Sequence, residues 1–456
     1  MPTILDFFSK YKPVPLNPIQ IAQNSFLADT RTTDPSLPPA QRKHSLAQGL
    51  LLNNKPREDK DFQGNPINQK AGQLFQMASV IEAKRLFFET CVKSSDDDKY
   101  ANPKDKILLG LEPLVQRVVF GNDSENGNLI SSKRIATIPL PGMAQSFTTI
   151  AAIIRQEYPD FDTVLFGSNG YEGYKTAFKD FFPNTKTYRH ATPDDKFDLE
   201  SFTKTIETLE HPERTLLLLQ ADSYNYTGVN PTTEQKKQII ETIKRFNILT
   251  LIDSAYQGLT RGLTEDTEII RMLAKENVPF IVYDSYSKKT QLYGWRTAFV
   301  HFVTANEEQA KIMRANLYSL IRNRYLSIAP TFKIVYHLLS NEALKKHWEE
   351  FDVPAARDIL VSTKTTLSSQ LQDGFEFVSP SQTQGMFNKL NITHEGGQIL
   401  ANKYGIFAVN LHDEDARDAQ GNLKQTLRVN MGGIPLDSLE YIAESFKEVY
   451  RTHKSL

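Results

Sequence analysis

Short, nearly uninterrupted apolar runs alternate with helical patterns through the middle of this 456-residue chain, from about residue 135 onward. Five of these runs have the length and composition of fully buried strands. They are residues 163–166, 215–219, 248–252, 280–283 and 298–303. Between the second and the third, the apolar residues of 233–246 share one helical face, and Thr232 with Gln235 supplies a capping box. Buried strands that alternate with helices predict an α/β fold with a mostly parallel sheet covered on both faces.

The segments on either side of this region have a different texture. The first fifth of the chain is irregular, and residues 29–42, with prolines among polar residues, are typical of an extended arm. After residue 330 a long helical segment (330–350) and a second helix (355–371) precede short strands and a closing helix that begins at Leu436. We expect the short strands at 375–378, 386–390, 407–409 and 427–429. The polar stretch 413–426 predicts a hairpin or insert that is solvated as a loop.

The length is sufficient for two or three domains, and a hydrophobic content of 40% is sufficient for a large core. We divide the chain into an N-terminal arm with a small-domain segment (1–58), a large domain (59–354) and a small α+β domain (355–456).

Charge and cysteine content exclude several classes of protein. The 53 basic and 54 acidic residues nearly balance, so there is no electrostatic case for nucleic acid or an acidic membrane surface as a partner. A single cysteine, Cys91, rules out an intramolecular disulfide framework and fits a reducing compartment. No apolar run approaches the length of a membrane span, and the N-terminus has neither a secretory core nor an arginine-rich transit pattern. We expect a soluble, cytoplasmic protein.

Polar residues follow three of the predicted strands, at the carboxyl ends where ligands bind in parallel sheets. Asn225 follows the strand 215–219, and Asp253 and Tyr256 follow 248–252. Ser285 and Lys288 follow the strand 280–283, and Arg296 comes eight positions after the lysine. An acid, an amide, a phenol and a lysine are therefore expected at one edge of the sheet.

This set of side chains suits a pyridoxal phosphate site. A lysine whose amine is kept neutral by burial or neighbouring charge can form an imine with an aldehyde cofactor. A carboxylate keeps the ring nitrogen protonated, a phenol and an amide hydrogen-bond the ring hydroxyl, and a serine with an arginine can hold the phosphate. Each residue also has a purely structural interpretation: Asp253 as a helix cap, Asn225 as a turn former, Tyr256 as a core aromatic and Arg296 as a surface cation. The neighbouring Lys289 is as plausible an imine-forming lysine as Lys288. The pyridoxal phosphate reading rests on the ordered set.

Five ordered motifs resemble those of the class I aminotransferases of fold type I, the aspartate and aromatic aminotransferase family. They are Tyr224–Gln235, Ile252–Gly258, Ser285–Arg296, Gly385–Phe387 and Leu427–Asn430. The resemblance covers the chain from about residue 45 to its end. It implies pyridoxal 5'-phosphate as the cofactor, no metal, and a homodimer with shared active sites.

The resemblance also implies roles for individual residues. Lys288 is the Schiff-base lysine and proton shuttle, Asp253 is the partner of the ring nitrogen, and Asn225 and Tyr256 are the partners of the ring oxygen. Ser285 and Arg296 hold the phosphate. Tyr171 takes the place of the aromatic residue that stacks on the ring.

For the substrate, the resemblance implies that Arg428 binds the α-carboxylate through a bidentate fork, beside Asn225. Arg322 corresponds to the second arginine, which reaches a side-chain carboxylate across the dimer interface. Arg324 lies close enough in the sequence to be an alternative, and a surface role for either arginine stays open.

The chain departs from the family around the phosphate. The family's hydroxyl-rich phosphate cup is replaced by Pro139–Met143, in which two prolines remove two N–H donors. We therefore expect the affinity for phosphate to fall unless the amides of Leu140, Gly142 and the following residues are sufficient together with Ser285 and Arg296. Two histidines that the family has near the cofactor are replaced by Tyr174 and Gln220, and the turn proline after Asn225 is replaced by Tyr226.

The function that follows is a ping-pong transfer of an amino group between an L-amino acid and a 2-oxo acid. The amino acid is either aspartate or glutamate, or an aromatic amino acid. Two alternatives stay open. One is another pyridoxal phosphate reaction, such as a β-lyase or decarboxylase reaction, on the same scaffold. The other is a non-catalytic descendant with weakened cofactor binding.

Overall fold

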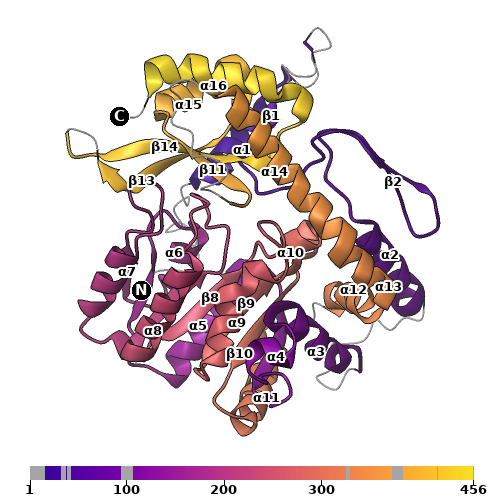
Figure 1. Cartoon of the computed structure of the whole chain (residues 1–456), viewed down its shortest axis with the longest axis vertical. Coiled ribbons are helices and arrows are strands. Elements are labelled where there is room, and N and C mark those ends of the chain that lie inside the picture. The colour runs from indigo at the N-terminus through magenta and orange to yellow at the C-terminus, as the bar shows by residue number, and fades with distance from the viewer. Residues whose placement is uncertain are drawn as a thin grey trace, which may run out of the picture.

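The computed structural model describes residues 16–31, 37–38, 43–93, 106–324, 329–371, 384–417 and 420–454. Its two main parts are a large layered unit around a central sheet and a smaller unit formed mainly by the C-terminal quarter of the chain (Figure 1).

The central sheet of the described chain has seven strands in the order β4-β10-β9-β8-β7-β5-β6. They span Ile135–Leu140 (β4), Thr163–Gly167 (β5), Asn184–Tyr188 (β6), Thr215–Gln220 (β7), Leu249–Ser254 (β8), Phe280–Ser285 (β9) and Ala298–Val303 (β10). Strand β10 is antiparallel to both of its neighbours, and the β9-β8-β7-β5-β6 pairings are parallel. The predicted α/β class and the five predicted strands are therefore confirmed. The edge strand β6 has no apolar run because four of its five residues are exposed.

Helices cover both faces of this sheet. The helices of the large unit are α3 (Lys106–Phe120), α4 (Asp123–Asn126), α5 (Gly142–Glu157), α6 (Gly173–Phe178), α7 (Leu199–Glu207), α8 (Thr233–Phe246), α9 (Glu268–Lys275), α10 (Tyr286–Lys289) and α11 (Glu307–Arg324). Successive residues of β7 point to opposite faces: Leu217 and Leu219 pack with α8 and α9, whereas Leu216 and Leu218 pack with α5 and α6. Both faces of the central strands are thus buried, as their apolar runs predicted. The predicted capping box of α8 is present, with Thr232 and Gln235 bonding reciprocally.

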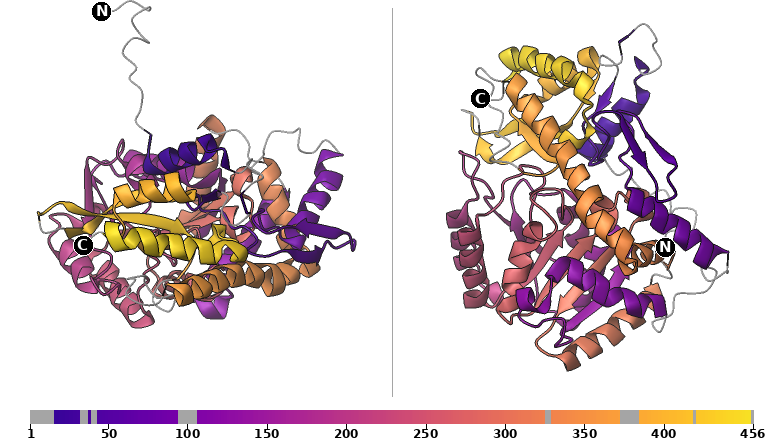
Figure 2. Two further views of the ribbon diagram at one scale, coloured as in Figure 1. Left: turned by 90° about the horizontal axis from the view of Figure 1, so that it is seen from above. Right: turned by 45° about the vertical axis from the view of Figure 1, so that its right-hand side comes forward.

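The smaller unit is built on a second sheet, β11-β14-β13, in the described residues. Its strands and helices are β11 (Phe387–Leu390), β13 (Val409–Arg417), β14 (Leu423–Asn430), α15 (His394–Tyr404) and α16 (Leu439–His453). The N-terminal segment joins this unit, since β1 (His44–Ser45) pairs with β12 (Ile406–Phe407). The long helix α14 (Val353–Gln370) runs between the two units (Figure 2).

Several predicted elements differ from the structure. The expected helix 330–350 is divided into α12 (Ala329–Ser340), α13 (Glu342–His347) and a π-helical turn, because Asn341 caps a new helix after a break. The first fifth of the chain is not irregular throughout: it contains α1 (Pro18–Ala28), the hairpin β2–β3 (Arg57–Lys60 and Pro66–Gln69) and α2 (Ala78–Phe87). The expected strand 375–378 and most of the arm 29–42 lie outside the described residues.

The stretch 413–426 was expected to be a solvated loop, and this expectation is wrong in part. It forms the outer ends of β13 and β14, so the hairpin alternative is correct, and Asp413 is buried against the large unit. Short-range polarity did not reveal this burial because the partners of these acidic residues lie far away in the sequence.

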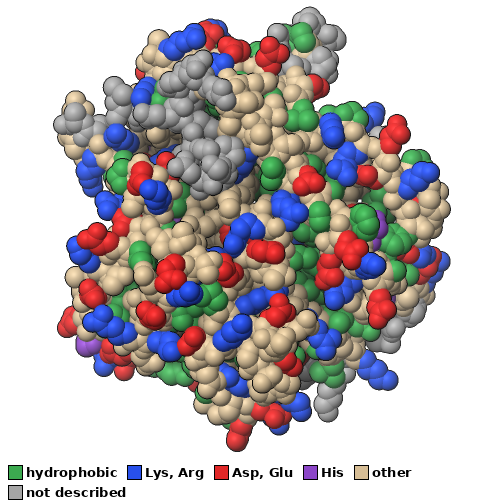
Figure 3. All heavy atoms as spheres, viewed as in Figure 1, with side chains coloured by type: hydrophobic (Ala, Val, Ile, Leu, Met, Phe, Trp, Pro, Cys, Tyr) green, Lys and Arg blue, Asp and Glu red, His purple; other side chains and the backbone are tan. Residues whose placement is uncertain are grey.

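None of the described helices is long and apolar enough to cross a membrane. On the face seen in Figure 3, basic and acidic side chains are interspersed, without an extended field of one sign.

Candidate active site

The polar residues that follow β7, β8 and β9 converge at the carboxyl ends of these strands. Asp253 is the penultimate residue of β8, and Ser285 is the last residue of β9. Asn225 and Tyr256 lie in the loops that follow β7 and β8. The short helix α10 follows Ser285 directly and carries Lys288. The structure therefore brings together the residues that the sequence placed at one edge of the sheet.

Asp253 is a buried carboxylate whose two oxygen atoms differ in their hydrogen bonding. Its Oδ2 accepts a hydrogen bond of 2.6 Å from the Tyr174 hydroxyl, whereas its Oδ1 has no hydrogen-bond partner among the described residues. Burial raises the pKa of Asp253 to about 6, and the Tyr174 hydrogen bond and the charge of Lys288 oppose this shift. A buried acceptor with a free oxygen is suited to a cationic N–H donor.

Tyr174 and Gln220 occupy the places behind this carboxylate. Tyr174 is fully buried in α6, and Gln220 Oε1 accepts the backbone N–H of Asn225 at 3.2 Å. Gln220 Nε2 also donates to the carbonyls of Asp222 and Ser223, at 3.2 and 2.7 Å. The tyrosine therefore orients the acid, and the glutamine orders the loop that carries Asn225.

Asn225, Tyr256 and Arg428 form a connected group. Asn225 Nδ2 donates to the Tyr256 hydroxyl oxygen at 3.1 Å, and Asn225 Oδ1 accepts from Arg428 Nη1 at 3.5 Å. Arg428 comes from β14 of the small unit, donates to the carbonyl of Ala47 at 2.7 Å, and lies over the ring of Phe387 at 4.5 Å. One arginine thus joins three parts of the chain that are remote in the sequence.

Arg428 is a buried guanidinium without an acidic partner among the described residues. Only 5% of its surface is exposed, and its Nε has no hydrogen-bond partner in the described part of the chain. Burial lowers the pKa of Arg428 because a cation that is held away from water is destabilised relative to its neutral form. An incoming carboxylate would supply the missing negative charge and accept from the free donor.

Lys288 and its neighbour Lys289 have opposite environments. Lys289 is completely buried, where its ammonium forms an ion pair with Asp284 and donates to Gln257 Oε1 at 2.7 Å. Lys288 is partly accessible, with its Nζ 5.0 Å from the centre of the Tyr256 ring. The structure therefore engages Lys289 inside the protein and leaves the amine of Lys288 in the site.

The charge state of Lys288 is suited to covalent chemistry. Burial lowers the pKa of Lys288 to about 8; the negative charge of Asp253 opposes the shift, and Arg296 and Arg428 add to it. With this pKa about one Lys288 amine in ten is neutral at pH 7, whereas fewer than about one in a thousand ordinary lysine amines is.

The start of α5 and the Arg296 side chain form an anion-binding corner. Helix α5 begins at Gly142 directly after β4, and its N-cap residue, Pro141, makes no side-chain capping hydrogen bond. Gly142 has a φ of +63°, which favours glycine, and a Cβ atom there would lie 2.2 Å from Arg296 Nη2, so a larger residue would displace the guanidinium. The first N–H groups of a helix and a neighbouring guanidinium together favour a phosphate. Ser285, buried at the start of α10, receives the N–H of Ser287 at 3.2 Å.

The remaining four residues predicted from the sequence have different positions. Leu140 is the last residue of β4, and its side chain lies in the core. Tyr171, just before α6, packs edge to face on Tyr174 with ring centres 5.7 Å apart. Arg322 and Arg324 belong to helix α11, but their side chains lie outside the described residues.

The site fits pyridoxal phosphate. The free, buried Oδ1 of Asp253 is suited to a protonated ring nitrogen, and Lys288 supplies an amine for the aldehyde. The α5 N-terminus and Arg296 form a corner for the phosphate in spite of Pro139 and Pro141, because neither proline occupies one of the first helical positions after Gly142.

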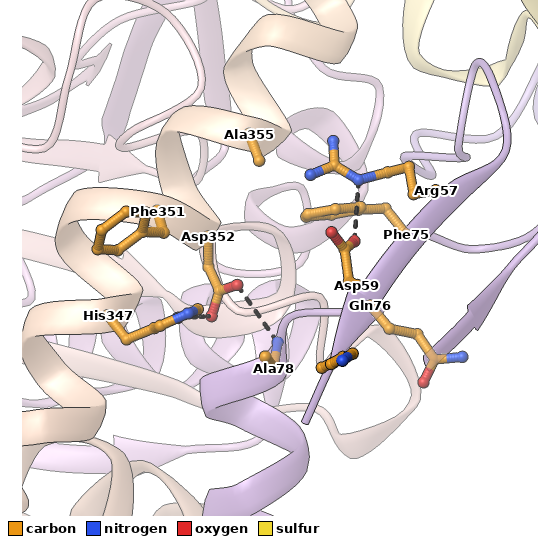
Figure 4. A pocket seen from close by; sticks show the side chains of 10 residues that line it. Arg57, Asp59, Phe75, Gln76, Ala78, His347, Phe351, Asp352 and Ala355 are labelled. Carbon is orange, nitrogen blue, oxygen red and sulfur yellow. Dashed lines mark hydrogen bonds and ion pairs between the residues drawn. The ribbon is translucent and has the colours of Figure 1, made fainter. Parts of the chain in front are cut away.

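A separate pocket of about 260 Å³ lies between the β2–β3 hairpin, the start of α2 and the end of α13 (Figure 4). Arg57 pairs with Asp59 at 2.9 Å, and Asp352 accepts the N–H groups of Ala78 and Ser79 at 3.3 and 3.1 Å. Asp352 therefore caps helix α2. None of the residues that line this pocket belongs to the strand-end site.

Comparison with known proteins places this geometry in context. A family model described as Aminotransferase class I and II matches residues 115–446. The aspartate aminotransferase of Pseudomonas aeruginosa is 26% identical over 303 residues, which cover 65% of this chain and 74% of that protein. The aspartate aminotransferase of Haemophilus influenzae is 26% identical over 454 residues, which cover 97% of this chain and 100% of that protein.

Solved structures show the same fold. An aromatic-amino-acid aminotransferase from Burkholderia pseudomallei, covalently bound to pyridoxal phosphate, has a TM-score of 0.80 at 22% identity, covering 97% of this chain and 99% of that one. A cytoplasmic aspartate aminotransferase from Giardia lamblia has a TM-score of 0.79 at 20% identity, covering 98% of each chain.

Proposed function

Since the chain belongs to the class I and II aminotransferase family and is a pyridoxal phosphate-dependent transaminase of fold type I, we propose the roles of its residues and its substrates. The amino donors are aspartate and glutamate or the aromatic amino acids, and the acceptors are 2-oxo acids. The single observation that carries the assignment of roles is the buried, half-satisfied carboxylate of Asp253 beside the amine of Lys288. The family match and the aminotransferase relatives favour transamination over a lyase, a decarboxylase or a non-catalytic protein.

The residues of this chain divide the work as follows. Bound pyridoxal phosphate supplies an aldehyde for covalent capture of amines and a ring that accepts electrons from the substrate Cα. Asp253 holds a positive charge at the ring nitrogen, and Asn225 and Tyr256 hydrogen-bond the ring oxygen. The helix α5 N-terminus, Ser285 and Arg296 hold the phosphate.

The substrate is bound by Arg428, which receives the α-carboxylate, with Asn225 beside it. Lys288 would take the substrate Cα proton onto its neutral Nζ and hold it there for return during the reaction. Phe387 would exclude water from the guanidinium of Arg428. Tyr171 would do the same for the ring of the bound cofactor.

The test is Lys288→Ala. We expect turnover to fall below detection, because both the covalent link and the proton carrier are lost, while the circular dichroism spectrum stays the same. The amino donors Asp, Glu, Tyr and Phe should each be assayed with 2-oxoglutarate. Lys179→Ala, on the exposed end of α6, is the control and should keep full activity. Substantial activity in the Lys288→Ala protein would overturn the assignment.

The active unit in this proposal is a homodimer, with Arg322 of one subunit serving the neighbouring site. Support comes from apolar side chains that are half exposed or more on α3 and α11, Leu109 and Ile312. Light scattering should give about twice the 51.8 kDa chain mass.

Mixed dimers test the sharing of the sites. If Lys288→Ala and Arg322→Ala proteins are each inactive, subunit exchange between them should restore up to about a quarter of the wild-type rate, because half of the dimers would be mixed and each would hold one intact site. No recovery after proven exchange would contradict a shared site.

The proposed location is the cytoplasm. It is supported by the presence of a single cysteine in the chain, Cys91, which excludes an intramolecular disulfide framework. Some relatives are named as mitochondrial or chloroplastic proteins, so fractionation of cells with an antibody to the chain is the measurement that decides it.

A further inference from the structure

The hairpin of β13 and β14 extends beyond the sheet to which it belongs. Strand β11 pairs with β14 only over residues 427–430, whereas β13 and β14 continue to pair out to Arg417 and Leu423. Among the described residues, the outer part of the hairpin has no third strand beside it, and it reaches toward α6 and the loop after β5 (Figure 1). Contacts with the large unit are what hold it there.

Asn169, in the loop after β5, is the centre of these contacts. Its side-chain Nδ2 donates to Asp413 Oδ1 at 2.8 Å and to Asp415 Oδ2 at 3.0 Å, and its Oδ1 accepts the backbone N–H of Glu414 at 2.8 Å. Ser168 Oγ adds a bond of 2.5 Å to Asp415 Oδ2. The whole amide of Asn169 is thus used on three consecutive residues of the hairpin.

The backbone of Asn169 faces the active site. Its carbonyl accepts the N–H of Tyr226 at 3.2 Å. Tyr226 follows Asn225, whose amide joins Tyr256 and Arg428. Asn169 has a φ of +54°, a left-handed conformation that asparagine tolerates, and this turn lets its side chain and its carbonyl engage separate partners.

The hairpin also acts on Tyr226 directly. Tyr226 is only 3% exposed, and its hydroxyl has no hydrogen-bond partner in the described part of the chain. Burial raises the pKa of Tyr226, and the negative charges of Asp413 and Asp415 raise it further, so the phenol lies within electrostatic reach of the hairpin.

The acidic charges of the hairpin are partly compensated. Asp413 pairs with Lys389 at 3.0 Å, and Glu414 pairs with Lys175. Asp415 relies on the neutral donors Ser168 and Asn169, and burial raises its pKa to about 6. Docking of Asp415 therefore depends on the hydrogen-bond donors of these two residues more than on ion pairing.

We propose that Asn169 is a positioning residue that couples docking of the β13–β14 hairpin to the placement of Asn225 and Arg428. The docked hairpin holds Asn169, Asn169 holds the Asn225–Tyr226 segment, and Asn225 keeps Arg428 aligned for the substrate α-carboxylate. The last step rests on the proposed function, whereas the coupling from hairpin to Asn225 does not.

The variant Asn169→Asp tests the coupling. Aspartate tolerates the same backbone conformation, but its carboxylate would face Asp413 and Asp415 without a donor. We expect hydrogen exchange of the peptide 222–230 to accelerate at least tenfold in the cofactor-loaded protein. Arg417→Ala is the matched control on the same hairpin, since that guanidinium donates to Gly421 O within the hairpin tip. It should leave exchange in 222–230 unchanged.

A second substitution provides the rescue. In Asn169→Asp/Asp415→Asn the new amide at 415 can donate to the new carboxylate at 169, so exchange in 222–230 should return to within threefold of wild type. If Asn169→Asp fails to fold, Asp415→Ala removes the bonds of Asp415 to Asn169 Nδ2 and Ser168 Oγ from the hairpin side, and exchange in 222–230 should again accelerate. Faster exchange in 411–417 with unchanged exchange in 222–230 would overturn the coupling.

Kinetics test the last step. In Asn169→Asp the KM for the amino donor should rise at least tenfold while kcat stays within threefold, because binding of the α-carboxylate is affected and the lysine is not. The rescued protein should regain the wild-type KM. If exchange in 222–230 responds to Asn169→Asp as expected but the wild-type protein transfers no amino group, only the proposed function is contradicted. Loss of kcat at constant KM would contradict the positioning role.

Discussion

At the scale of single residues, neighbouring side chains of the same type have different chemistry because their surroundings differ. Lys288 and Lys289 are adjacent, yet Lys289 is bound in a buried ion pair and Lys288 has its pKa lowered to about 8 in the site. The sequence motif selected Lys288 by resemblance. The structure adds a physical reason, since the Lys289 amine is already occupied by Asp284 and Gln257.

Tyr174→Phe should move the acid side of the pH profile. The Tyr174 hydroxyl stabilises the ionised form of Asp253, whose pKa is about 6, so its removal raises that pKa and leaves less carboxylate at a given pH. We expect the acid limb of kcat/KM to shift upward by about one to two pH units, since a hydrogen bond to a charged group contributes about 1.5–3 kcal/mol and one pKa unit corresponds to about 1.4 kcal/mol. The measurement is the pH dependence of kcat/KM.

Tyr286→Phe is the control for that shift. It removes another buried hydroxyl, one that has no hydrogen-bond partner among the described residues, and should leave the acid limb in place. An unchanged profile in Tyr174→Phe would show that the hydroxyl does not govern the ionisation of Asp253.

At the scale of elements, the helix that carries Lys288 is only four residues long and is held by buried groups around it. Lys289 binds Asp284 on β9 and Gln257 beside Tyr256, and the indole of Trp348 donates to the Lys289 carbonyl at 2.9 Å. A helix this short has little stability of its own. Tertiary contacts therefore hold α10 in place.

Lys289→Met should destabilise the protein by about 3–5 kcal/mol, because it leaves the carboxylate of Asp284 buried without its cation. Chemical denaturation followed by fluorescence measures the loss. Asp284→Asn/Lys289→Met removes both charges and should recover a large part of it, and Lys275→Met on the exposed end of α9 should cost little. A Lys289→Met protein as stable as wild type would mean that the pair does not support α10.

At the scale of the whole molecule, the site exists only where two units meet. Lys288, Asp253 and Asn225 belong to the large unit, whereas Arg428 comes from the small sheet and Ala47, its acceptor, from the N-terminal segment. Binding at the strand ends should therefore stabilise the packing between these parts as well as each part alone.

Adding pyridoxal phosphate to the cofactor-free protein should raise its thermal midpoint by several degrees, since saturation at about 100 times Kd contributes about 2.7 kcal/mol. Pyridoxal without the phosphate should stabilise less, and Arg296→Gln should remove much of that difference because one of the phosphate partners is lost. Differential scanning fluorimetry compares the ligands. Equal stabilisation by the two ligands in the wild type would show that the corner at Gly142 and Arg296 does not bind phosphate.

Much of the architecture was predictable from the sequence alone, because its signals are local. Apolar runs and helical periodicity located β5, β7, β8, β9 and β10 and the helix α8, and the order of polar residues after the strands placed Asn225, Asp253, Tyr256, Ser285 and Lys288 at one edge. A parallel sheet puts the ends of its strands together, so position along the chain was enough to predict that these residues meet.

Other features were decided only by the tertiary structure. The bond from Tyr174 to Asp253, the pairing of Lys289 with Asp284 and the docking of the acidic hairpin on Asn169 depend on contacts between distant segments. Polarity suggests a solvent-exposed loop at 413–417, but burial and hydrogen bonding are properties of the neighbours that folding brings in. Local signals in the sequence were enough to predict five of the seven strands of the sheet and the chemical groups that follow three of them. Tertiary packing decided which of those groups are paired, which are left with a free hydrogen-bonding atom, and which lysine amine stays available.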